Sequence, residues 1–200
     1  MNARKGNTST TGYTLRGKTL AELDKEIDKV GPKDPNESAR YAGSCLGKID
    51  LLIGGNDLAY QPKAGSSPLE VTATLKGGTM TSSCQTTLPK LASEKQLTAT
   101  ALKEWKRFVA ATKSHEEGHA DDYFALAQTL ADEAKALSAV GKGKDEKAAK
   151  ADAQKEMLEL LKKTYGGTVL ADRIKAAAKA YDKKTNHGVS QKAVLKTSIV

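Results

Sequence analysis

The sequence predicts an α+β fold, in which one small antiparallel sheet packs on a long helix and further helices follow. Between residues 38 and 91, glycine, serine and threonine are frequent and short apolar runs alternate with polar residues, as in strands. After Pro89, apolar residues recur every three or four positions, as on one face of a helix. A chain of 200 residues is long enough for one core. We therefore expect a single domain over residues 13–200, mainly sheet at 13–91 and helical at 92–200.

The first thirty residues predict a leader and one helix. Residues 1–12 are polar and contain glycine, so they are expected to be a disordered leader. Residues 13–16 could form a short strand. Thr19 and Glu22 have the spacing of a capping box, and apolar residues follow at helical spacing. Gly31 and Pro32 are expected to end this helix.

Strands are expected at residues 48–53, 69–75 and 80–88, with glycine-rich turns between them. The helical periodicity then predicts a long helix over about residues 100–139, which the glycines at 141 and 143 interrupt. Two further helices are expected, at about residues 145–164 and 169–181. Residues 186–200 have no assigned structure.

The chain carries a formal charge of +8. Its lysines alternate with acidic residues along the expected helices, and aromatic residues are not placed among them. This pattern favours a solvated surface over a nucleic-acid interface. No apolar run approaches the roughly 20 residues that span a bilayer, so no membrane span is expected. The polar residues 6–12 stand where a signal peptide would be apolar, so the chain is either cytoplasmic or a mature exported form.

Cys45 and Cys84 are the two cysteines, and both lie in the sheet-rich half. Their spacing is not that of a metal or redox motif, so we interpret them as structural. In an oxidising compartment they would close a loop of about 40 residues and stabilise the fold by roughly 4 kcal/mol. In the cytoplasm they would be two buried thiols.

Residues 115–119 read His-Glu-Glu-Gly-His within the long predicted helix. His115 and His119 are four residues apart, so both imidazoles lie on one helix face and can bind one metal ion. Glu116 can then act as general base toward a water on that ion. Gly118 leaves space beside the site for a strand or a substrate. The chain has three histidines, and this motif contains two of them.

The third ligand is open from the sequence. Position 125 is Ala125, which excludes the metzincin pattern. Glu133 would lie about 21 Å beyond His119 on a straight helix, too far to share the ion. Asp122 is one turn past His119 and is better placed to orient an imidazole. His187 is our preferred third ligand; alternatively it stabilises the transition state by a hydrogen bond, or is an exposed loop residue.

The chain resembles a bacterial family known as domain of unknown function 922, described as predicted zinc-dependent proteases that are often exported. The likeness spans most of the chain, and its specific parts are residues 115–119, Tyr181 with Asp182, and residues 185–188. It implies a zincin-like peptidase and a periplasmic or extracellular location. It does not identify a substrate.

We therefore expect a zinc-dependent peptidase that acts on a peptide or protein, with Zn²⁺ on His115, His119 and His187. Glu116 is the expected base and Tyr181 the expected donor to the oxyanion. The strand at residues 80–88 is expected to be a sheet edge that binds substrate as an added strand. The alternative is a non-catalytic binding protein with a structural or vestigial metal site. A weaker reading is a basic nucleic-acid binder.

Overall fold

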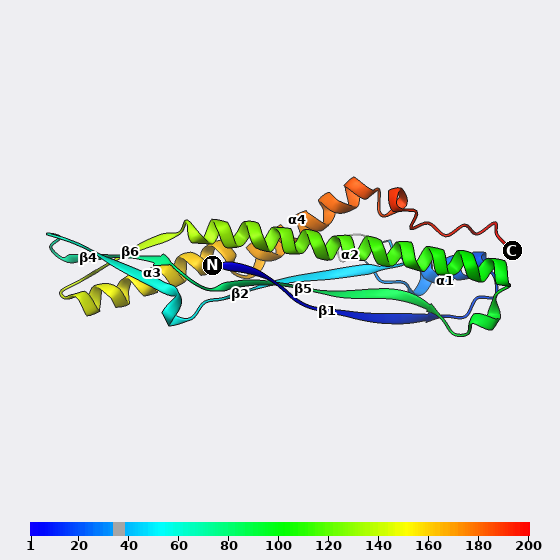
Figure 1. Cartoon of the computed structure of the whole chain (residues 1–200), viewed down its shortest axis with the longest axis horizontal. Helices are drawn as coiled ribbons and strands as arrows, with labels where there is room; N and C mark the ends of the chain where they lie inside the picture. Colours follow the sequence, from blue (N-terminus) through cyan, green and yellow to red (C-terminus); the bar gives the residue numbers. More distant parts are fainter. Residues whose placement is uncertain (34–38) are drawn as a thin grey trace. The chain divides into compact units, whose positions relative to one another are not determined.

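The computed structural model describes residues 1–33 and 39–200 and has the expected α+β fold class (Figure 1). Residues 34–38 of the expected sheet-rich part lie outside the described residues. The strands are β1 (Asn2–Leu15), β2 (Ser44–Leu52), β3 (Leu58–Lys63), β4 (Leu69–Leu75), β5 (Thr79–Leu91) and β6 (Ser138–Gly143). The helices are α1 (Leu20–Val30), α2 (Ala99–Lys135), α3 (Glu146–Tyr165) and α4 (Gly167–Thr185), with short 3-10 turns η1 (Gly55–Asp57), η2 (Glu94–Gln96) and η3 (Val189–Gln191).

The strands form two three-stranded sheets, in the orders β1-β5-β2 and β3-β4-β6. In the second sheet, β4 pairs antiparallel with both neighbours. In the first, the amide of Asn2 donates to Gly78 at one end, and that of Ala92 donates to Leu15 at the other. These bonds join the two beginnings and the two ends of β1 and β5, so this pair is parallel. The single antiparallel sheet expected from the sequence is therefore two sheets, one of which contains a parallel pair.

The first strand corrects the expectation of a disordered leader. Residues 2–15 form β1, and the hydroxyl of Thr11 donates to the carbonyl of Thr86 at 3.3 Å. Threonine and tyrosine favour extended backbone, and an outer strand needs apolar residues on few of its positions. A polar composition therefore did not exclude a strand here.

The described residues divide into two compact units, each with its own core. The first comprises Met1–Gly6, Lys48–Ser82 and Tyr123–Ala177. The second comprises Asn7–Gly47, Ser83–Asp122 and Ala178–Val200. This division differs from the expected single domain. Each unit contains segments from both the expected sheet-rich part, residues 13–91, and the expected helical part, residues 92–200.

In the first unit, α3 packs closely on β6. A β-carbon on Gly141 or Gly143 would overlap the backbone of Ala153 or Ala149 on α3, so only glycine permits this approach. Residues 138–143, expected as the end of the long helix and a break, are instead a strand paired with β4. The glycines expected to break the helix thus lie in β6, where they bring α3 onto the sheet. The start of α3 agrees with its prediction, and Asp145 caps it by accepting from the amide of Ala148 at 2.8 Å.

The second unit is built on α1 and the first part of α2. Helix α1 begins and ends as predicted: Thr19 accepts from the amide of Glu22 at 3.2 Å, and Gly31 follows its last residue. Its buried residues pack with the start of α2 and with one residue near the C-terminus. This core contains Leu15, Leu20, Leu23, Ile27, Ala101, Trp105, Phe108 and Leu195. It anchors the stretch of α2 that leads to residues 115–119.

Among the described residues, no helix is both long enough and apolar enough to cross a membrane.

Candidate metal centre

Helix α2 brings His115 and His119 together. Both lie on one face of the helix and both are buried, with 7% and 6% of their surface exposed. Their ring centroids are 4.8 Å apart. Four residues make slightly more than one helical turn, so the two rings project in nearly the same direction. The two imidazoles are therefore adjacent on one helix face, as their spacing in the sequence predicts.

Asp182, on the last turn of α4, completes the cluster. Its Oδ1 lies 3.4 Å from Nε2 of His115 and 3.1 Å from Nε2 of His119. One ligand atom from each of the three residues lies within 4.8 Å of the other two. Zinc bonds of about 2.0–2.1 Å in a tetrahedron imply ligand separations of about 3.3 Å. The two carboxylate–imidazole distances match that separation.

The Asp182 carboxylate and the imidazole of His115 each stabilise the charged form of the other. Burial opposes ionisation of Asp182, but hydrogen bonds from His115 and His119 outweigh it and hold the pKa of Asp182 well below its usual value. Burial likewise opposes protonation of His115, but its hydrogen bonds to Asp182 and Gln191 raise the pKa of its imidazole. The Asp182 carboxylate is therefore ionised at neutral pH and available to a cation.

Glu116 lies beside this cluster in a buried position, with 4% of its surface exposed. Burial raises the pKa of its carboxyl to about 7, although the nearby His115 and His119 favour the charged form. Part of this burial comes from Gly43, just before β2. A β-carbon there would lie 2.5 Å from Oε1 of Glu116, so backbone covers the carboxyl directly. A carboxyl with a pKa near neutrality can both accept and release a proton.

Tyr181 packs on both histidines. Its ring stacks on that of His115 at 5.3 Å and meets that of His119 edge-on at 4.6 Å. Its hydroxyl lies where a β-carbon of Gly118 would be, so the space left by this glycine is filled by Tyr181 and not by a strand or substrate. The hydroxyl also accepts a hydrogen bond from Nε2 of Gln191 at 2.9 Å.

Gln191 contacts the cluster as well. Its Oε1 lies 2.8 Å from Nδ1 of His115, the ring nitrogen that faces away from Asp182. A hydrogen bond at this nitrogen fixes the orientation of the ring and leaves the other nitrogen free for a metal. The sequence did not indicate this residue, since a lone glutamine in a tail without assigned structure carries no pattern.

His187, the preferred third ligand, is not in the cluster. It is exposed, and its ring stacks on that of Tyr41 at 5.7 Å. The physical reason is the length of α4, which continues to Thr185 instead of ending near Tyr181. Asp182 is therefore on the helix and faces the histidines, whereas His187 follows it in left-handed backbone (φ 49°).

The other acidic residues considered from the sequence are also outside the cluster. Glu133 accepts two hydrogen bonds from Arg173, at 2.6 and 2.8 Å, which lower the pKa of its carboxyl. This ion pair belongs to the first unit, whereas the histidines belong to the second. Asp122 is half-buried and is not part of the three-residue group. The side chain that contacts Nδ1 of His115 is that of Gln191.

One signal in the sequence did point to Asp182. Residues 178, 181, 182 and 185 follow the helical spacing i, i+3, i+4, i+7, and all are at least half-buried in α4. Extending the predicted helix by one turn would have placed Asp182 on the same face as Tyr181.

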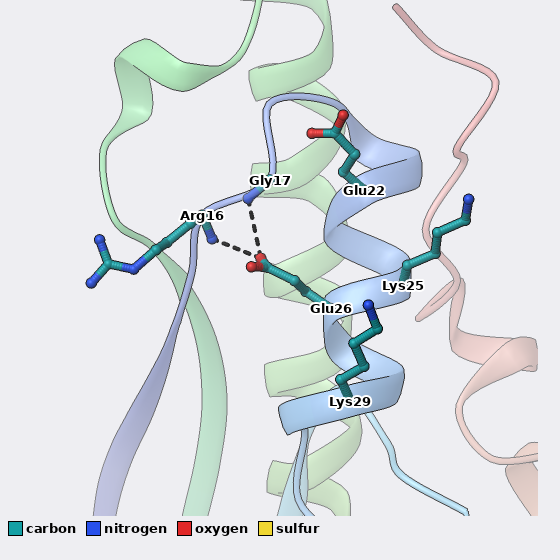
Figure 2. A pocket seen from close by; sticks show the side chains of 6 residues that line it. All are labelled: Arg16, Gly17, Glu22, Lys25, Glu26 and Lys29. Carbon is teal, nitrogen blue, oxygen red and sulfur yellow. Dashed lines mark hydrogen bonds between the residues drawn. The ribbon is translucent and has the colours of Figure 1, made fainter.

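A pocket of about 290 Å³ lies elsewhere in the second unit, and Figure 2 shows the residues that line it: Arg16, Gly17, Glu22, Lys25, Glu26 and Lys29. Its backbone donors are already engaged, since the amides of Arg16 and Gly17 donate to Glu26 at 2.7 and 3.1 Å. The Arg16 side chain points away from that carboxylate. None of these residues belongs to the metal cluster, and the pocket lies between α1 and the turn before it.

A family model described as a bacterial protein of unknown function (DUF922) matches residues 10–188. The chain belongs to this family. No match was found among curated proteins or among solved structures. The DUF922 match includes all three residues of the cluster and Glu116, and it ends three residues before Gln191.

Proposed function

We propose that this DUF922 protein is a zinc-dependent peptidase with a zincin-like, helix-borne site. His115, His119 and Asp182 hold the ion, and Glu116 is the general base. The observation that carries the proposal is the convergence of two Nε2 atoms and one carboxylate oxygen beside a buried carboxyl whose pKa is about 7. This combination is typical of sites that activate water.

The donor set fits zinc in a catalytic arrangement. Two imidazole nitrogens and one carboxylate oxygen are ligands that zinc accepts, and three protein ligands leave a fourth position for water or substrate. A structural zinc site is closed by four protein ligands, usually including thiolates. Both cysteines of this chain form the Cys45–Cys84 disulfide, so neither offers a thiolate. These features support a catalytic over a structural site.

The bound ion would supply a water of lowered pKa and polarise the carbonyl of the scissile peptide bond. Glu116 takes a proton from the attacking water on its carboxylate and delivers it to the nitrogen of the departing amine. A nearby cation stabilises the charged form of a carboxyl and so lowers its pKa. The burial-raised pKa of Glu116 would therefore fall in the metal-loaded protein, into the range of a base at neutral pH.

Tyr181 remains our proposed donor to the oxyanion. Its hydroxyl accepts from Gln191, which leaves its own proton available for donation. Its ring contacts with His115 and His119 also give it a positioning role. Tyr181→Phe separates the two roles, because it keeps the ring and removes the proton. If Tyr181→Phe keeps its zinc but turns over substrate more slowly, Tyr181 donates to the oxyanion. If its turnover is unchanged, Tyr181 has only the positioning role.

The expected substrate edge requires a correction. The strand over residues 80–88 is part of β5, which is the middle strand of its sheet and has no free edge. The outer strand β2 begins at Ser44, directly after Gly43, whose backbone covers Glu116. We propose that an extended peptide pairs with the outer edge of β2, which brings its backbone to the base.

A pair of neighbouring substitutions tests the proposed function. Glu116→Gln removes the base but keeps size, so zinc should stay while hydrolysis of unstructured peptides falls by about two to four orders of magnitude. Glu117→Gln is the matched control, because Glu117 is exposed and pairs with Lys113 at 3.6 Å. Equal activity in wild type and Glu116→Gln would place the base elsewhere. Wild-type protein that holds zinc but hydrolyses no peptide would favour the non-catalytic binding protein.

A further inference from the structure

The amide of Gln191 joins two residues of the metal centre. It is half-buried at the end of η3, in the segment after α4. Its Oε1 lies 2.8 Å from Nδ1 of His115, and its Nε2 donates to the hydroxyl of Tyr181 at 2.9 Å. One side chain therefore contacts both a ligand and the ring that packs on it.

The amide oxygen of Gln191 faces Nδ1 of His115 at 2.8 Å, and an amide oxygen can only accept a hydrogen bond. This contact therefore favours the form of His115 with its proton on Nδ1. Without a metal, Nε2 of His115 can donate to Asp182, 3.4 Å away. When an ion binds Nε2, the neutral imidazole has its lone pair on Nε2 and its single proton on Nδ1. With the amide reversed, its nitrogen would donate to Nδ1, and the lone pair would be turned away from the cluster. The hydroxyl of Tyr181 can accept from the amide nitrogen, as observed, or donate to the amide oxygen of the reversed orientation. The observed orientation is the one that leaves the lone pair on Nε2 of His115 for an ion.

We propose that Gln191 is a positioning residue of the metal centre, which selects the Nδ1-protonated form of His115 and so presents Nε2 to the ion. This inference rests on the metal site in the proposed function. Partners of this kind typically change metal affinity by about tenfold to a hundredfold. The residue lies outside the range matched by the DUF922 model, in a segment to which the sequence assigned no structure.

The segment that carries Gln191 is held by contacts that do not involve its side chain. Arg107 on α2 donates to the carbonyls of Lys192 and Val194, at 2.6 and 2.7 Å. The amide of Lys196 donates to Glu104 at 3.1 Å, and Leu195 is buried in the core of the second unit. Removing the Gln191 side chain should therefore leave the segment in place.

The test compares zinc affinity, by competition with a chelator, in wild type and in three variants. Gln191→Leu cannot accept the proton of Nδ1, so its affinity should fall about tenfold to a hundredfold. Gln191→Glu still accepts that proton and should keep affinity within about threefold of wild type. Arg107→Gln is the control for a loosened segment, and it should lower the melting temperature with a smaller loss of affinity than Gln191→Leu.

A second readout reports the ring directly. The Nδ1 proton of His115 should be visible by NMR in zinc-loaded wild type and Gln191→Glu, and should exchange away in Gln191→Leu. If Gln191→Leu proves unfolded by circular dichroism, Gln191→Met replaces it. Equal affinity in wild type and the apolar variant, or equal losses in the Leu and Glu variants, would overturn the proposal. Wild-type protein without zinc affinity would instead refute the metal site itself.

Discussion

The hydroxyl of Tyr181 lies in the space that a β-carbon on Gly118 would occupy. This contact joins α4 to α2 within the His-Glu-Glu-Gly-His motif, between Glu116 and His119. Tyr181 packs on both histidine rings, and the next residue, Asp182, is the third member of the cluster. The glycine therefore sets how closely α4, and with it the carboxylate, approaches the histidine pair.

Gly118→Ala should destabilise the protein and weaken metal binding. In an open helix this change stabilises by about 1 kcal/mol, because alanine is the better helix former. Here the added methyl overlaps Tyr181, and overpacking of this kind costs about 1–3 kcal/mol. Urea denaturation measures the first effect and chelator competition the second.

The double variant Gly118→Ala with Tyr181→Ala is the control. Without the phenol, the methyl has space, and adding Gly118→Ala to Tyr181→Ala should be neutral or stabilising. If the losses of unfolding free energy in the two single variants add up to the loss in the double variant, the overlap with Tyr181 is not the cause.

The pH dependence of stability should reveal the buried Glu116. In the metal-free protein its folded pKa of about 7 lies above the ordinary value of 4.5, so folding favours the protonated form. Protonated Glu116 therefore contributes to the unfolding free energy of wild type below pH 4.5. This contribution should be lost as the pH rises through about 7. The loss corresponds to about 3 kcal/mol.

Glu116→Gln is neutral at every pH and should not show this loss. The difference in unfolding free energy between the two metal-free proteins should therefore grow in favour of the variant from pH 4.5 to 8. His115 and Asp182 titrate in both proteins, so their contributions largely cancel. A difference that stays constant over this range would mean that the carboxyl is not desolvated.

The Cys45–Cys84 disulfide should contribute measurably to stability. It joins residues 39 apart in sequence, with their Cα atoms 6.1 Å apart. The chain-entropy model gives about 4 kcal/mol for a loop of this length. Reductant should therefore lower the melting temperature of wild type, while a Cys45→Ser and Cys84→Ser double variant should not respond. Titration of two free thiols in denatured, unreduced protein would contradict the bridge.

Local patterns in the sequence predicted α1, the start of α3 and the histidine pair, because caps and helical spacing act over a few residues. Thr19 and Asp145 cap their helices as such residues do in many contexts. His115 and His119 share a face because any regular helix brings residues four apart together.

The sequence failed where distant segments decide the outcome. Residues 138–143 are a strand because β4 supplies a partner and their glycines admit α3, and neither contact is visible locally. Asp182, and not His187, lies beside the histidine pair because α4 continues for one more turn than expected. Gln191 is positioned by Arg107, 84 residues earlier in the chain, through the carbonyls of Lys192 and Val194.

The zinc content of three proteins, purified in parallel without added metal, tests the central claim most directly. We predict about one zinc per chain in wild type and in His187→Ala, because His187 is exposed and stacks on Tyr41. Asp182→Ala should lose most of its zinc while keeping its helical circular dichroism, because it removes the only carboxylate of the three-residue group. Zinc lost from His187→Ala but retained by Asp182→Ala, or no zinc in wild type, would contradict the account.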